Sequence, residues 1–372
     1  RVGNLIGSNA LAAVSSSGSL IFLLVGFFNG LAVGAGVVIA RYYGAREVKE
    51  LQKAVHTTVG FGILCGFLLM VAGLVLAPRM LIWMKTPEEV LPESIAYFRI
   101  YFLGSLGFVL YNNFVGILQS VGDSRHPLYY LIFSSIVNIV LDLLFVGVFH
   151  FGVGSVAAAT AISQFASAAL CLYRLTKKSP EEYRVSLRQI QLNPFMLRQI
   201  IRNGLPAGIQ NSVISIANVF VQSNINSFGK VAMAGCGAYS KVEGFAALPV
   251  TCFSMALTTF ISQNLGAQKY DRVKKGARFG ILCGMTLTEL IGIVIYVMIP
   301  VLISFFNNAP EVIAYGTKQA HIVTPFYFLM AYAHCTAGIM RGAGKSSVPM
   351  FVMLLCWCLL RVPYVSIAVH LN

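Results

Sequence analysis

Long apolar runs separated by short polar segments make up most of this chain. A helix needs roughly 20 consecutive, largely apolar residues to cross the hydrocarbon core of a bilayer. The runs that meet this length lie at residues 10–38, 57–78, 94–118, 128–149, 153–173, 205–227, 232–262, 278–303, 313–338 and 347–370. Strands of a membrane barrel would instead show segments of about 10 residues with alternating polarity, and these runs do not alternate. The pattern therefore predicts an all-α polytopic membrane protein.

The chain also repeats itself at an offset of 222 residues. IARYYGA, which ends at Ala45, falls on ISQNLGA, which ends at Ala267, and QSVGDSRHP at 119–127 falls on RGAGKSSVP at 341–349. One offset that holds over such a distance predicts two lobes with the same fold. We place the lobes and the linker between them at residues 1–175, 176–200 and 201–372.

The repeat also predicts how the spans are distributed. Residues 192–222 have no counterpart before Arg1, and the partner of the run at 153–173 would follow residue 372. We therefore expect a full molecule of twelve spans, of which about ten are complete here, with the first mostly absent and the last absent. Six spans in each lobe give both lobes the same orientation, which makes a parallel repeat.

Composition and charge refine this interpretation. Hydrophobic residues make up 57% of the chain and charged residues 11%, whereas soluble proteins average about 25% charged residues. Most of the 27 Lys and Arg residues lie in alternate loops and in the linker, and the positive-inside rule places such segments in the cytoplasm. We expect a multi-pass protein of the cell membrane, whose net charge of +14 reflects topology and contact with lipids and not binding to nucleic acid.

Several segments resemble phosphate-binding or metal-binding motifs but lack the spacing that these motifs require. GAGKSS at 342–347 lacks the first glycine of a phosphate-binding loop, since Ile339 stands there, and its repeat has Asp123 in place of Lys345. A tight turn in both copies explains the motif better. The eight cysteines and six histidines show no paired-ligand or CxxC spacing. We therefore expect no metal site beyond a coupling cation and no cofactor.

Ionisable and amide side chains within the apolar runs stand out, because charges at membrane depth are costly and usually mark a pathway. Asp142 lies four residues after Asn138, so both side chains share one helix face. Asn112 and Asn113 lie in the preceding run, and the following run carries Thr160, Ser163 and Gln164. Such oxygen atoms suit a proton or a hard monovalent cation. The alternative is an Asp142 that only ties helices together by hydrogen bonds.

The duplicated plan resembles the multidrug and toxic compound extrusion (MATE) family. The resemblance rests on YYGA and NLGA, on QSVGDS and RGAGKS, and on GLPAGIQ at 204–210, in this order along the chain. It implies two six-helix bundles around a central cavity that opens alternately to each side. It also implies a monomeric antiporter, surrounded by membrane lipids, that exchanges sodium ions or protons for bulky, often cationic or lipophilic small molecules.

The resemblance assigns the coupling site to the N-terminal lobe. The family positions for cation binding in that branch match Asn138, Asp142, Asn112 and Thr160. A further aspartate of the family's first span would precede Arg1. The branch that relies on acids in the C-terminal lobe fits less well, because the run at 205–227 has no carboxylate, and that at 313–338 has none at the depth where this branch has one.

Other charges remain in the C-terminal lobe. We expect Glu243 to pair with Lys241 or to contact substrate, Arg361 to act in helix pairing or gating, and Glu289 to be a packing acid. Three rival functions stay open: a flippase for lipid-linked oligosaccharides, an intramembrane enzyme, and a receptor that only binds. We do not expect an enzyme, because the chain lacks a GxSG-type serine with a partner histidine and lacks HExxH.

Overall fold

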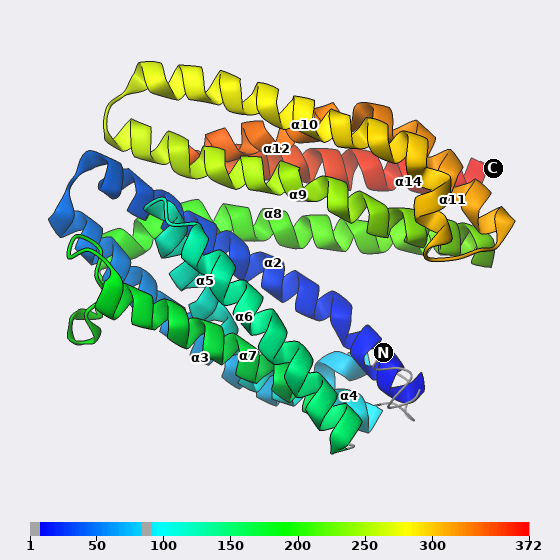
Figure 1. The fold of residues 1–372 in the computed structure, drawn as a ribbon, viewed down its shortest axis with the longest axis horizontal. Helices are drawn as coiled ribbons and strands as arrows, with labels where there is room; N and C mark the ends of the chain where they lie inside the picture. Colours follow the sequence, from blue (N-terminus) through cyan, green and yellow to red (C-terminus); the bar gives the residue numbers. More distant parts are fainter. Residues whose placement is uncertain (1–7, 84–90, 150, 153, 372) are drawn as a thin grey trace. The chain divides into compact units, whose positions relative to one another are not determined.

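The computed structural model describes residues 8–83, 91–149, 151–152 and 154–371, with side chains described only between 24 and 369. Every regular element in this part of the chain is helical (Figure 1). Nine of these helices are long and apolar enough to cross a membrane, or ten if one bent pair counts as a span. The predicted all-α polytopic class is confirmed. The chain forms two compact units, Arg1–Gly208 and Ile209–Asn372.

The first unit is built around α5. Its elements are α2 (Ser8–Ala45), α3 (Val48–Trp83), α4 (Leu91–Leu103), α5 (Ser105–Ser120), α6 (Arg125–Asp142), the π-helix η1 (Leu143–Val148), α7 (Gly154–Tyr173), the π-helix η2 (Arg174–Lys178), the 3₁₀ turn η3 (Leu187–Gln189) and the start of α8 (Pro194–Ser227). Helix α5 packs against α2, α3 and α7, and α7 also packs against α6. The three helices that carry the predicted coupling residues, α5, α6 and α7, are therefore neighbours.

The second unit is built around α9. It contains the rest of α8, then α9 (Lys230–Gly266), α10 (Tyr270–Ser304), α11 (Pro310–Val323), the 3₁₀ turn η4 (Thr324–Phe326), α12 (Tyr327–Gly342), α13 (Ser347–Leu354), the π-helix η5 (Leu355–Arg361) and α14 (Val362–Leu371). Helix α9 packs against α10, α11 and α12. The hydroxyls of Tyr239 and Tyr327, both fully buried, lie 2.9 Å apart in this core.

The repeat recurs in the backbone of the turns. Arg46 and Gln268 are 222 positions apart, follow α2 and α9, and have left-handed φ angles of 59° and 57°. Gly122 and Gly344 follow α5 and α12 and have φ angles of 91° and 78°. A left-handed backbone favours glycine. GAGKSS and its partner are therefore the tight turns that the sequence predicts.

Matching helix crossings repeat as well. In the second unit, Gly338 of α12 lies against Ser254 of α9, and the Ser254 hydroxyl donates to the carbonyl of His334 over 2.7 Å. In the first unit, Gly116 of α5 occupies the equivalent place against Ala32 of α2. Small residues let helix backbones approach closely in membranes. The same crossing therefore organises both units.

Both units break the helix that precedes the glycine turn. Helices α4 and α5 bend by 41° at Gly104, and α11 and α12 are separated at the equivalent place by η4, which contains Pro325. A Cβ at Gly104 would lie 2.6 Å from the Cβ of Ala161 on α7. Gly104 therefore permits the close approach of α7.

The predicted linker packs on the protein. Tyr183 and Val185 are 7% and 2% exposed and belong to the core of the first unit. His56 of α3 is buried, its Nδ1 lies 2.7 Å from the carbonyl of Gln52, and its Nε2 accepts the N–H of Ser186 over 3.0 Å. Since α8 begins at Pro194, its first turns lie within the predicted range of 176–200. The segment before α8 is thus docked on α3. Its mixture of charged and apolar residues is typical of a segment at a membrane interface, but its side chains Tyr183 and Val185 lie in the core of the first unit instead.

An ion cluster joins the turn after α5 to the end of α7. Asp123 lies 2.8 Å from Nδ1 of His126 and 3.6 Å from the guanidinium of Arg174. Burial alone would raise the pKa of Asp123, but the hydrogen bonds of His126 and the charge of Arg174 outweigh it and hold that pKa below its ordinary value. The charged carboxylate therefore stabilises the folded state.

Asp123→Asn is expected to lower the melting temperature at neutral pH. Because the pKa of Asp123 is lower in the folded state, its contribution is present above the unfolded value of about 3.9 and is lost as the pH falls through the folded value. The difference in melting temperature between wild type and variant should therefore shrink in acid. Thermal unfolding in detergent at neutral and acidic pH measures it, and a difference that does not change with pH contradicts this role.

Candidate coupling site in the first unit

Two of the predicted coupling residues meet directly. Asn138 of α6 donates from Nδ2 to the hydroxyl of Thr160 on α7 over 3.4 Å, and that hydroxyl donates in turn to the carbonyl of Val156 over 3.0 Å. The amide nitrogen of Asn138 is engaged in this contact, so its carbonyl oxygen is the atom left to act as a ligand. The juxtaposition of the two runs that the sequence predicts is therefore present.

Asp142 ends α6, at the point where the helix changes to the π-helix η1. Single π turns occur often at functional sites, because they widen the helix and redirect side chains. The Oδ1 atom of Asp142 is buried and has no hydrogen-bond partner. Within the described residues no basic side chain lies at ion-pair distance from it. A buried carboxylate oxygen without a partner is costly, and a proton or a bound cation would satisfy it.

Asn112 is not joined to this pair. Its Nδ2 donates to the carbonyl of Phe108, one turn earlier on α5, over 2.8 Å. Neighbouring Asn113 behaves alike, is only 7% exposed, and donates to Val109 over 2.9 Å. Both amides bond within their own helix through nitrogen, so Asn112 can offer a ligand only through Oδ1.

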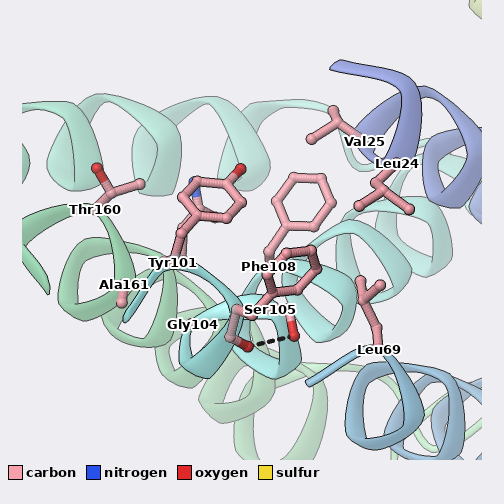
Figure 2. A pocket seen from close by; sticks show the side chains of 11 residues that line it. Leu24, Val25, Leu69, Tyr101, Gly104, Ser105, Phe108, Thr160 and Ala161 are labelled. Atoms are coloured by element: carbon pink, nitrogen blue, oxygen red, sulfur yellow. Dashed lines mark hydrogen bonds between the residues drawn. The ribbon is translucent and has the colours of Figure 1, made fainter. Parts of the chain in front are cut away.

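A cavity of about 90 Å³ lies beside Thr160 (Figure 2). In this view Thr160 and Ala161 lie at one side and Leu24, Val25 and Leu69 at the other, with Tyr101 and Phe108 between them. Gln164 also lines the cavity, and its Oε1 is buried without a hydrogen-bond partner. Since one water takes about 30 Å³ of liquid volume, the cavity has room for a few waters.

Two tyrosines extend the site in a way that sequence reasoning missed. Tyr97 of α4 is 7% exposed and lies within electrostatic range of Asp142. Its ring stacks near that of Tyr101, with centroids 6.4 Å apart, and Tyr101 lines the cavity. The two rings therefore connect Tyr97, in the interior of the unit, to the wall of the cavity. Their spacing of four residues was the available signal, but a tyrosine in an apolar run does not differ from a packing aromatic by sequence alone.

The charges of the second unit form separate contacts. Arg361 donates from Nη1 to Oδ1 of Asn218 over 3.1 Å. Lys241 lies over the ring of Phe306, with Nζ 5.1 Å from its centre, and it makes no ion pair with Glu243. Residues two apart on a helix do not face each other. Glu289 accepts the backbone N–H of Phe328 over 3.0 Å, as a packing acid would.

Comparison with known proteins relates this chain to one protein family. The family model described as MatE matches residues 1–144 and 206–367. The probable multidrug resistance protein YoeA of Bacillus subtilis is 31% identical over 375 residues, with 99% of this chain and 81% of the relative covered. The probable multidrug resistance protein NorM of Thermotoga maritima is 25% identical, with 97% and 78% covered.

Solved structures agree on the fold. An outward-facing multidrug resistance MATE family transporter of the MOP superfamily superposes with a TM-score of 0.91 at 22% identity, and the match covers 99% of this chain and 82% of that one. At this identity the likeness concerns the fold alone. The family match, the relatives and the membrane-spanning helices together assign the chain to transport and not to catalysis, and the chain belongs to the MATE family of multidrug efflux transporters.

Proposed function

We propose that this chain is a secondary antiporter that exports bulky, often cationic or lipophilic compounds in exchange for sodium ions or protons. The observation that carries the proposal is the buried, unpartnered Oδ1 of Asp142. A site that satisfied this oxygen permanently would leave no place for a coupling ion. An oxygen that lacks a partner is instead ready to bind one.

The ligand set in this proposal comes from three helices. Asp142 and Asn138 on α6 and Thr160 on α7 supply carboxylate, amide and hydroxyl oxygens, which can replace the hydration shell of a monovalent cation. Asn112 contributes from α5 through Oδ1. A proton would bind at Asp142 alone. Binding of the ion at this site changes the packing of α6 against α7. Alternating access follows if the ion binds one conformation of the protein better than the other.

We also propose that the basic loops face the cytoplasm. Within the first unit, contacts bring three of the basic segments together: Arg174 lies 3.6 Å from Asp123 beside the turn after α5, and Gln52 of α3 donates to the carbonyl of Glu182 in the linker over 3.2 Å. Short loops rich in Lys and Arg stay on the cytoplasmic side. The protein works as a monomer in the cell membrane.

Purified protein in liposomes, loaded with a fluorescent lipophilic cation, tests the function. A sodium gradient and a pH gradient are imposed in separate experiments, each directed so that the ion would enter the liposome as the dye leaves. One of the two gradients should accelerate export. The gradient that accelerates export identifies the ion. Export that responds to neither gradient would refute the antiport mechanism.

A further inference from the structure

The first turns of α10 carry a group of exposed cations. Residues 269–278, here called the basic segment, contain one acid and five basic residues, Lys269, Arg272, Lys274, Lys275 and Arg278. All five basic side chains are exposed, and within the described residues none of them forms an ion pair within 4.0 Å. Lys274 and Arg278 are four positions apart, a spacing at which like charges destabilise a helix. An anionic partner would remove this repulsion.

The equivalent segment of the first unit, residues 47–56, already has partners. It contains two lysines and two glutamates, and Nζ of Lys53 lies 2.7 Å from the carboxylate of Glu50. The linker also covers this segment, because Gln52 and His56 bond to backbone groups of the linker over 3.2 and 3.0 Å. The first unit therefore closes this surface with its own chain.

The residues that dock the linker are the ones that differ in the second unit. Besides Gln52 and His56, Thr57 holds the linker by accepting the N–H of Asn193 over 3.2 Å. A shift of 222 positions places three exposed side chains at these points, Lys274, Arg278 and Phe279. A docking surface of the first unit is thus replaced in the second by an exposed basic and aromatic surface.

The basic segment lies at the edge of the bilayer. Helix α10 has 35 residues and rises roughly 52 Å, whereas the hydrocarbon core is about 30 Å thick, so the ends of α10 extend beyond it. Phe279 and Leu282 are 70% and 63% exposed, and their spacing sets them on one helix face with Arg272 and Lys275. This face therefore presents cations at the level of the headgroups and apolar side chains at the level of the acyl chains.

We propose that the basic segment binds the headgroups of anionic phospholipids. The lipid phosphate accepts hydrogen bonds from Arg272 and Lys275, and the acyl chains pack against Phe279 and Leu282. Clusters of four to eight basic residues beside a membrane span attract anionic lipids. A zwitterionic lipid gains less, because its own ammonium group repels the neighbouring cations. The equivalent segment of the first unit, which the linker covers, does not offer this surface.

A tryptophan placed inside the site reports which lipid lies beside it. Trp83→Phe and Trp357→Phe remove the two native tryptophans, and Phe279→Trp then adds the reporter to the full chain. The protein is reconstituted into mixed bilayers of phosphatidylglycerol and phosphatidylcholine with equal acyl chains, of which one lipid is brominated and quenches a neighbouring indole. Phosphatidylglycerol should bind at least about fivefold more tightly, the gain expected from one cation beside an anionic headgroup.

Two changes should remove this preference. Arg272→Gln combined with Lys275→Gln should make the two affinities nearly equal, and both positions are exposed, so folding is not at stake. High salt should act in the same direction, because it screens the attraction between exposed charges. Lys53→Gln is the matched control, since Lys53 is the counterpart of Lys275 in the repeat, and it should leave the preference unchanged.

A second reporter position tests whether the preference is local. Val297→Trp, at a 72% exposed position about five turns further along α10, should be quenched equally by both lipids. The same preference at Val297 as at Phe279 would overturn the proposal, and so would equal quenching at Phe279 or a preference that survives the double substitution. Lipid binding needs no transport, so this result is independent of the proposed antiport.

Discussion

Replacing Asp142 with asparagine is expected to abolish ion-driven export while the protein stays folded. Asparagine has nearly the same shape but carries no titratable proton and no charge, so the Asp142 carboxylate of the proposed coupling site is lost. Coupling energies between two ligands are typically about 1–3 kcal/mol, or roughly 5- to 150-fold in affinity. The acceleration by the gradient should therefore disappear in a liposome assay, and export should fall to the rate without a gradient.

The matched control for this experiment is Asp271→Asn, in the exposed first turn of α10. This variant also removes one carboxylate but lies outside the coupling site, and its export should remain gradient-driven. Equilibrium binding of the dye to Asp142→Asn should persist, because asparagine has nearly the same shape as aspartate. Loss of dye binding together with loss of export would point to misfolding, and retained coupling would show that Asp142 only ties helices together.

Gly338→Ala is expected to destabilise the second unit strongly. The new Cβ would overlap the backbone carbonyl oxygen of Ser254, and a backbone atom cannot rotate away as a side chain can. Helices α9 and α12 would have to separate and stretch the bonds that the hydroxyls of Ser254 and Thr258 make across the crossing. Overpacking of this kind costs about 1–3 kcal/mol, which thermal unfolding in detergent detects.

The repeat supplies a control at the equivalent position of the first unit. A Cβ at Gly116 would lie 3.3 Å from the carbonyl oxygen of Ala32, so a small shift relieves it, and Gly116→Ala should cost less than about 1 kcal/mol. Gly237→Ala adds a methyl where nothing lies within 4 Å and should be neutral or stabilising, since alanine favours a helix over glycine by about 0.5–1 kcal/mol. Equal losses for all three variants would contradict this explanation.

The fold was predictable because its main constraints are local or periodic. Apolar length identifies helical spans, and the single offset of 222 predicted a pair of tight turns, which the left-handed angles of Gly122 and Gly344 bear out. The bend at Gly104 was not predicted, because Gly104 lies inside an apolar run long enough for one unbroken span. The docking of Tyr183 and Val185 was also missed, because an amphipathic segment fits a membrane surface as well as a protein surface.

The candidate site was predictable in part for the same reason. The spacing of Asn138 and Asp142 sets them on one face of α6, and hairpin connectivity brings α7 beside it, so the contact with Thr160 follows. The orientation of Asn112 toward its own helix depends on rotamers that spacing does not determine. The stacking of Tyr97 near Tyr101, which lines the cavity, depends on tertiary packing that no local pattern reveals.

Ion movement driven by the substrate itself tests the central claim most directly. In an antiporter, coupling works in both directions, so a gradient of a lipophilic cation across the liposome membrane should drive sodium ions or protons the opposite way without any imposed ion gradient. We expect this flux for the wild type and for Asp271→Asn, and none for Asp142→Asn. Substrate-driven ion flux that survives in Asp142→Asn would contradict the account.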